Sequence, residues 1–228
     1  MHNIKDGHKP MNGLSKILYN NSNLKSLKLI STKLGVERIK LLFGALSKND
    51  VVESLSLQCS QIGVEEGEEI AKFLCINTIL ISLDVSYNNL EAEGGNMLLA
   101  ALCENDSLKD LNLEMNRLGS EVGKTVAELL CKNTTLTSLN ISKNDLASGG
   151  IALADALCKN TSLLSLNMNS NRLGLEEGKK LAEALQKNTT LVFLDISNNR
   201  FGSEGLYMLE NCKNTKLTLY SGFIKSHL

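Results

Sequence analysis

The chain has 228 residues, of which 43% are hydrophobic, 21% are charged and 4% are aromatic, and its formal net charge at pH 7 is -1. Residues 1–50 are basic, with nine Lys or Arg against three Asp or Glu, whereas residues 51–206 are acidic, with twelve against twenty-one. This distribution argues against a nucleic-acid-binding protein, because neutralising phosphates needs a basic stripe along the binding surface. No run of about 18 apolar residues predicts a membrane span, and the first residues lack the apolar segment of a signal peptide.

The first part of the chain, residues 1–22, is predicted to be a partial repeat that caps one end of the fold. Leu14, Ile17 and Leu18 fall at helical spacing. We expect one helix whose apolar side covers the first full repeat.

A unit of about 28 residues then fills most of the sequence. In residues 162–189, Leu163, Leu166 and Met168 alternate with polar residues as in a strand, whereas Leu181 and Leu185 lie at helical spacing. One strand and one helix per period of this length predict a solenoid. The seven units are 23–50, 51–78, 79–106, 107–134, 135–161, 162–189 and 190–215. They form one repeat region, 23–215, and residues 216–228 are predicted to form a final strand and tail that cap the other end.

Three positions of the unit carry recurring residues that we interpret as scaffold. An Asn that follows the strand is expected to be buried and to bond the turn backbone: Asn88, Asn116, Asn144, Asn171 and Asn199. An Asn at the helix end is expected in the left-handed conformation: Asn49, Asn77, Asn105, Asn133, Asn160, Asn188 and Asn214. A Gly at the helix start is expected where close packing leaves no room for a side chain: Gly67, Gly95, Gly123 and Gly178.

Four of the six cysteines share one repeat position, at intervals of 28, 28 and 27 residues: Cys75, Cys103, Cys131 and Cys158. Stacked helices lie about 8–10 Å apart, which is too far for a disulfide, and a ladder of thiols does not converge on a metal ion. We therefore expect free, partly buried thiols in a reducing, cytoplasmic compartment, with no metal and no cofactor.

Segments such as LTSLNISKNDL and LVFLDISNNRFGSEG, each followed by a helix ending in KNT or a similar sequence, resemble the ribonuclease-inhibitor subfamily of leucine-rich repeats. The resemblance covers about 193 of the 228 residues. It implies an α/β solenoid shaped as a horseshoe, with a parallel β-sheet on the concave face and α-helices on the convex face. The helix ends LCKNT and ALQKNT also resemble repeat proteins that intracellular bacteria secrete into host cells, which implies delivery as a secreted effector.

Alternation along each strand predicts which side chains reach the concave face. The candidate partner-binding residues are Asp84, Tyr87, Asp110, Asn112, Glu114, Met115, Arg117, Asn140, Lys143, Asp145, Asn167, Arg172, Phe193, Asp195 and Arg200. Tyr87, Met115 and Phe193 are apolar at positions that should face solvent. Each aromatic ring either packs on a neighbouring repeat or is an interface anchor, a role that aromatic and Arg side chains often have.

The charged residues among these candidates also have two interpretations. Asp84, Asp110 and Glu114 are predicted on adjacent strands, either as a solvated acidic face or as partners for a basic surface that speed encounter. The rim arginines, such as Arg117 and Arg172, either pair with acids of this chain or contact the partner.

Catalysis by the chain itself is not expected. All three histidines, His2, His8 and His227, lie in the terminal segments, so the repeats lack a base for a Ser or Cys nucleophile. Paired carboxylates such as Asp84 and Asp110 need a closed pocket to act as acid and base, and an open sheet offers none.

The sequence therefore predicts a module that is monomeric when free and binds one partner protein through its concave face, with no nucleic acid and no membrane. Resemblance to ribonuclease inhibitor implies an enzyme as partner, regulated by covering its active site. Two alternatives are a regulator of a small GTPase, by resemblance to Ran GTPase-activating protein, and the ligand-sensing repeat region of a larger receptor.

Overall fold

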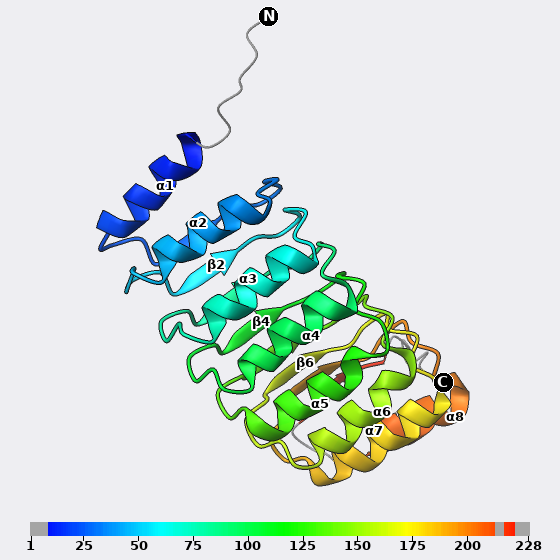
Figure 1. Cartoon of the computed structure of the whole chain (residues 1–228). Coiled ribbons are helices and arrows are strands. Elements are labelled where there is room, and N and C mark those ends of the chain that lie inside the picture. Colours follow the sequence, from blue (N-terminus) through cyan, green and yellow to red (C-terminus); the bar gives the residue numbers. More distant parts are fainter. Residues whose placement is uncertain (1–8, 213–216, 222–228) are drawn as a thin grey trace, which may run out of the picture.

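The computed structural model describes residues 9–212 and 217–221, in which short strands alternate with helices (Figure 1). The strands are β1 Ser26–Lys28, β2 Ser54–Ser56, β3 Ser82–Asp84, β4 Asp110–Asn112, β5 Ser138–Asn140, β6 Ser165–Asn167, β7 Phe193–Asp195 and β8 Thr218–Tyr220. The helices are α1 Lys9–Asn20, α2 Val36–Leu46, α3 Val64–Leu74, α4 Glu91–Leu102, α5 Val122–Lys132, α6 Gly150–Leu157, α7 Leu175–Lys187 and α8 Gly202–Glu210, with a 3-10 turn η1 at Ala147–Gly149 before α6.

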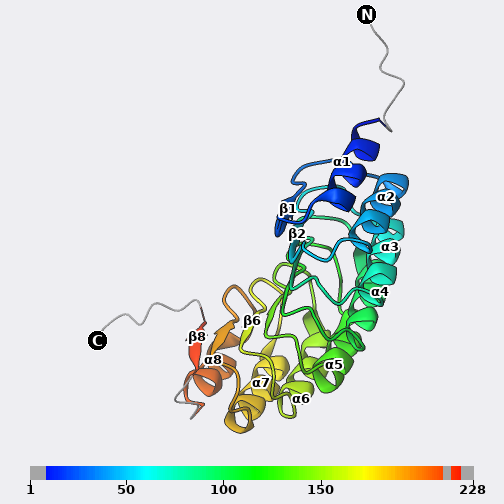
Figure 2. The same cartoon turned by 90° about the vertical axis from the view of Figure 1, so that its left-hand side faces the viewer.

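All eight strands form one parallel sheet in chain order. Their central leucines pair in a single row: Leu27, Leu55, Leu83, Leu111, Leu139, Leu166, Leu194 and Leu219. Strands pack about 4.8 Å apart whereas helices need about 10 Å, so the stack curves with the strands inside. Figure 2 shows this arc, with the helices along its outer side. The predicted α/β solenoid, with a concave sheet and convex helices, is confirmed.

The core lies between the sheet and the helices. In the 162–189 unit, Leu163, Leu166 and Met168 are fully buried, as the alternation predicts. At the first helix, Leu18 is fully buried but Ile17 is 59% exposed, so the prediction is wrong for Ile17. Consecutive residues of a helix point in directions about 100° apart, so Ile17 and Leu18 lie on different sides of α1. The side of α1 that carries Leu18 packs against α2, and Ile17 points away from this contact.

The asparagines that follow the strands form a ladder that is buried at Asn88, Asn116, Asn144 and Asn171, as predicted, whereas Asn199 is only partly buried, so burial was wrongly predicted for Asn199. The Asn144 Nδ2 donates to the carbonyl oxygens of Leu113 (2.9 Å) and Ile141 (3.1 Å), and its Oδ1 accepts from the backbone N–H of Asn116 at 2.8 Å. Each side chain thus joins its own turn to the preceding repeat. In the second unit Ser60 has this position, and its hydroxyl donates to the Leu29 carbonyl at 2.7 Å.

The asparagines at the helix ends are not left-handed, so that prediction is wrong. Asn133 has φ -79° and ψ 130°, an extended conformation, and Asn188 is similar. Instead, the Asn133 Oδ1 accepts the N–H groups of Thr135 (2.8 Å) and Leu136 (2.7 Å), while its Nδ2 donates to the Leu102 carbonyl in the preceding repeat. The Asn133 side chain therefore supplies hydrogen-bond partners for backbone groups at the helix end, so the chain does not need a left-handed residue there to pair them. Asn214 lies outside the described residues.

Glycines at the helix starts occupy close contacts, as predicted. A Cβ at Gly95 would lie 2.5 Å from Leu118, and one at Gly123 would collide with the backbone of Gly149. All six cysteines are free. Cys103 and Cys158 are partly buried, but Cys75 and Cys131 are exposed, so partial burial was wrongly predicted for those two. Within the described residues, no helix has the length and apolar character to cross a membrane.

Candidate functional site

One repeat position on the concave face carries a short polar side chain that bonds its own backbone. In five consecutive strands, the Oδ1 atom at the strand end accepts the N–H two residues further on, at 2.9–3.0 Å. The five residues, which we call the concave row, are Asp84, Asn112, Asn140, Asn167 and Asp195. This local bond explains why Asp and Asn occur here, because short side chains with an acceptor favour such turns.

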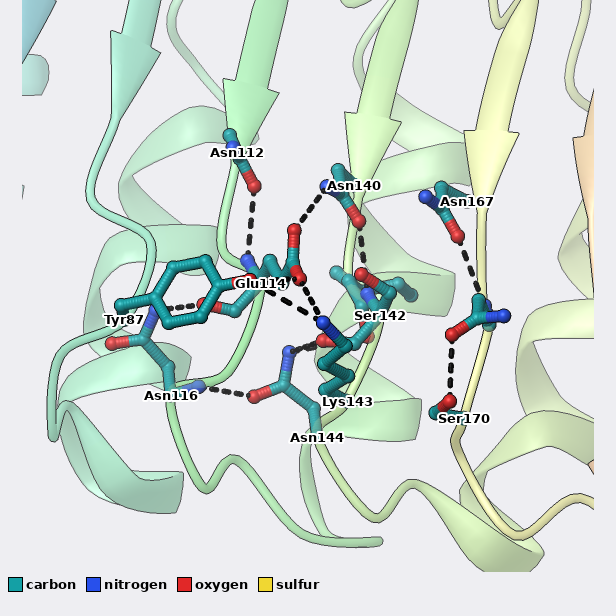
Figure 3. Close-up of polar contacts among 12 residues, drawn as sticks. Tyr87, Asn112, Glu114, Asn116, Asn140, Ser142, Lys143, Asn144, Asn167 and Ser170 are labelled. Atoms are coloured by element: carbon teal, nitrogen blue, oxygen red, sulfur yellow. Dashed lines mark hydrogen bonds and ion pairs between the residues drawn. The ribbon is translucent and has the colours of Figure 1, made fainter. Parts of the chain in front are cut away.

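Three side chains next to this row form a bonded network, shown in Figure 3. The Tyr87 hydroxyl donates to Glu114 Oε1 at 2.7 Å, and the Lys143 Nζ lies 2.7 Å from the same oxygen and 3.3 Å from the Tyr87 hydroxyl. Asn140 donates to the other carboxylate oxygen at 3.4 Å, and the ammonium lies 5.6 Å from the centre of the Tyr87 ring. The network joins three adjacent repeats.

Charge in the network is balanced. Burial alone raises the pKa of Glu114, but hydrogen bonds from Lys143 and Tyr87 outweigh it, so the net pKa lies below the usual value. The same bonds, from Glu114 first and then Tyr87, raise the pKa of Lys143. Both groups are therefore charged at neutral pH and neutralise each other. Of the three predicted acids, Glu114 is already paired within the chain.

The other two acids keep their charge available. Asp110 is exposed, and no cation of the described residues lies within ion-pair distance of it or of Asp84. Asp84 is half-buried, and its Oδ2 accepts a long bond from Ser56 at 3.4 Å. The predicted acidic cluster is thus reduced to these two side chains.

Tyr87 and Met115 remain open to solvent, at 38% and 48% exposure. Both, like Lys143, have φ between 54° and 58°, a region that bulky residues rarely adopt. Asn198 holds the equivalent position in the seventh unit at φ 54°. Asn adopts this conformation more readily than Tyr or Met does. The geometry of the turn therefore does not explain why Tyr87 and Met115 occur at this position.

Of the predicted rim residues, Arg172 pairs with Asp145, with Nη1 2.7 Å from Oδ2. This confirms the intramolecular reading for Arg172. Arg117 and Arg200 are exposed and have no ion pair with any described residue. They stay available for a partner.

Phe193 packs on a neighbour, as the alternative reading predicted. Its ring centre lies 5.4 Å from that of Tyr220 in β8, at an interplanar angle of 43°. Tyr220 is 54% exposed and was missed as a site residue. The signal was available, because Tyr220 pairs with Asp195 in register and so shares the position of the concave row.

No group of three or more His, Cys, Asp or Glu side chains in the described ranges is arranged to hold a metal ion. A groove of about 700 Å³ lies at the N-terminal ends of α5 and α6, lined by residues such as Lys124, Ile151 and Asp155. It contains none of the predicted site residues.

Comparisons with known proteins support the repeat architecture. The family described as Leucine Rich repeat matches residues 77–99, 132–154, 159–182 and 187–209. Among solved structures, the chain is similar to the tropomodulin C-terminal domain of Caenorhabditis elegans, at 19% identity and a TM-score of 0.52, over 78% of this chain and 92% of that one. It is also similar to Leiomodin-1 Actin-Binding Site 2, at 22% identity and a TM-score of 0.55, over 70% of this chain and 91% of that one.

At these identities the likeness shows the fold alone, which is a leucine-rich-repeat solenoid. A search of curated proteins found no match. The ribonuclease-inhibitor subtype and the secreted-effector origin stay predictions.

Proposed function

We propose that this leucine-rich-repeat solenoid binds a partner protein through its concave face, with Tyr87 and Met115 at the centre of the contact. The observation that carries the proposal is the exposure of these two side chains, at 38% and 48%, beside a fixed polar network. Exposed aromatic and apolar anchors surrounded by polar groups are typical of interface hot spots.

Pre-organisation strengthens the proposal. Glu114 and Lys143 fix the Tyr87 hydroxyl, and the concave row is fixed by its backbone bonds. Less side-chain entropy is lost on binding when the contact groups are already ordered. A curved sheet made of bonded repeats therefore offers a rigid binding surface.

The partner is proposed to be an enzyme whose active site the concave face covers. The resemblance to ribonuclease inhibitor supports this, as does the size of the curved face, which extends over eight strands. The free protein is proposed to be a monomer. Its six free thiols support a reducing compartment such as the cytoplasm.

The test is capture of partners by the intact protein from an extract of cells that make it. Captured proteins are identified, purified and assayed for activity with and without the solenoid. Actin belongs in the binding panel because one structural neighbour is named for an actin-binding site, and small GTPases belong in the activity panel.

Paired variants separate the concave face from the rest. The double variant Tyr87→Ala with Met115→Ala is expected to lose the partner. Tyr207→Ala on α8, where Tyr207 is 70% exposed, is the matched control and is expected to retain it. A partner that binds both variants equally well contradicts the proposed face, and an enzyme partner whose activity is unchanged contradicts the inhibitory role.

A further inference from the structure

The concave row has a fixed chemical pattern that runs across five strands. Each Oδ1 is bonded to a backbone N–H, so the other atom of each head group is turned away from that bond. A backbone N–H can only donate, so the bonded atom of each Asn must be its carbonyl oxygen and the atom on the other side must be Nδ2. One N–H of the Asn140 amide also donates to Glu114 Oε2, in a long bond of 3.4 Å, which leaves its second N–H for a ligand. The row thus presents a carboxylate oxygen at Asp84, amide donors at Asn112, Asn140 and Asn167, and a carboxylate oxygen at Asp195.

The spacing of this pattern is set by the sheet. Neighbouring strands lie about 4.8 Å apart, so Asp84 and Asp195 are separated by four spacings, or about 19 Å. Asn140 lies halfway, at about 9.6 Å from each end. The side chains point to the inside of the curve, which brings their head groups slightly closer together.

A polyproline II segment has almost the same period. It rises about 3.1 Å per residue with three residues per turn, so groups three positions apart lie on one side at about 9.3 Å, and groups six positions apart at about 18.6 Å. Its backbone makes no internal hydrogen bonds, so its carbonyl oxygens are free to accept from amide donors. A helix has no such free carbonyls along its length.

Each end of the row carries a carboxylate whose Oδ2 can accept further bonds: at Asp84 this atom has only the long 3.4 Å bond from Ser56, and at Asp195 it has no hydrogen-bond partner among the described residues. Tyr87 follows Asp84 by three residues, and Tyr220 pairs in register with Asp195. Both rings are partly exposed, at 38% and 54%, although the Lys143 ammonium lies 5.6 Å from the centre of the Tyr87 ring and the Tyr220 ring packs on Phe193. A carboxylate near an aromatic face suits a cationic side chain, above all the guanidinium of Arg.

We propose that the concave row binds an extended, polyproline II segment of the partner that carries two basic residues six positions apart. The basic residues pair with Asp84 and Asp195, and carbonyl oxygens between them accept from the amides of Asn112, Asn140 and Asn167. This inference rests on the proposed function and names the chemistry of the partner.

The test uses defined peptides and the intact, 15N-labelled protein. The probe is the blocked peptide Arg-Ala-Pro-Ala-Pro-Ala-Arg, and the comparison peptides carry the two arginines four or eight positions apart in the same Ala-Pro background. Titrations are followed through the side-chain amide signals of Asn112, Asn140 and Asn167. The buried ladder amides of Asn116 and Asn144 serve as internal controls.

The probe is expected to shift the three concave signals, to leave the ladder signals unchanged and to bind about 5-fold more tightly than either comparison peptide. Asp84→Asn and Asp195→Asn are each expected to weaken the probe about 3- to 5-fold and to abolish its advantage. Both variants keep the fold, because Asn makes the same backbone bond at this position in three repeats.

Binding that does not depend on the arginine spacing, binding that both Asp variants retain, or absence of binding by every peptide overturns the inference. The proposed function fails on a different result, namely partner capture that survives loss of Tyr87 and Met115. The two failures are therefore distinguishable.

Discussion

The Tyr87 hydroxyl lies 2.7 Å from Glu114 Oε1, although 27 residues separate them in the sequence. The contact forms because β3 and β4 are neighbours and the two side chains follow equivalent strands. With Lys143, it joins side chains from three adjacent repeats in one neutral, ordered patch on the concave face.

Glu114→Gln is expected to lower the free energy of unfolding at pH 7 by about 0.5–1 kcal/mol, because the partly exposed pair with Lys143 loses its charge. The folded pKa of Glu114 is lowered, so its stabilising contribution is present above the usual Glu pKa and is lost as pH falls through the folded pKa. Urea unfolding should therefore show the full difference between wild type and variant above about pH 5 and a shrinking one below about pH 4.

The matched control for this experiment is Glu176→Gln on α7. The Glu176 side chain is 71% exposed and lies 3.4 Å from Lys179. Its substitution is therefore expected to leave the free energy of unfolding unchanged both at pH 7 and below about pH 4. A Glu114→Gln difference that stays constant from pH 7 to pH 3 contradicts the assigned pairing.

Asn144→Ala is expected to destabilise the protein by about 2–4 kcal/mol, because buried backbone groups of Leu113, Ile141 and Asn116 lose their partner. Asn144→Ser should cost less, about 1–2 kcal/mol, since a hydroxyl can keep one of these bonds. Ser60 shows that this substitution fits the ladder position. Equal losses for the two variants, measured by urea unfolding, would show that the hydrogen bonds do not decide the stability.

Gly123→Ala and Gly44→Ala make a matched pair. At Gly123 a Cβ collides with the Gly149 backbone, and we expect a loss of about 3 kcal/mol from overpacking. At Gly44, inside α2, a Cβ meets nothing within 4 Å, and we expect a gain of about 0.5–1 kcal/mol from the better helix propensity of Ala. Thermal melts of the two variants should shift in opposite directions, and shifts in the same direction would refute the packing argument.

Ser86→Ala is expected to stabilise the protein by about 1 kcal/mol, because the buried Ser86 hydroxyl has no hydrogen-bond partner among the described residues. Ser197→Ala, at the same repeat position, is expected to destabilise by a similar amount. Its hydroxyl donates to Asp195 and accepts from Asn169. Chemical unfolding of both variants checks the contrast, and a stability loss for Ser86→Ala means that its hydroxyl is paired after all.

Regular features of the fold were predictable because each is repeated. The inward leucines recur in every complete unit, and the alternation of side chains along a strand is enough to predict that they face the core. The asparagines equivalent to Asn144 recur in five of the seven units, which is enough to identify them as part of the scaffold. The helix-end asparagines were recognised but given the wrong conformation. Their position is compatible with two ways of satisfying backbone groups, and only the structure shows that Asn133 uses its side chain.

The candidate site was predictable as a set of positions but not as a set of contacts. Alternation placed Glu114 and Lys143 on the concave side, but their pairing depends on the side-chain lengths and on the register between adjacent repeats. The backbone bond of Asp84 and the ring contact between Phe193 and Tyr220 likewise need coordinates.

The most direct test of the central claim is the dissociation constant of the purified partner for three forms of the protein. We expect Tyr87→Ala with Met115→Ala to raise it more than about 10-fold, which corresponds to about 1.4 kcal/mol, because both side chains are proposed anchors. Tyr207→Ala on the convex side should leave it unchanged. The opposite result, a partner that is lost with Tyr207→Ala and kept with the double variant, would contradict binding through the concave face.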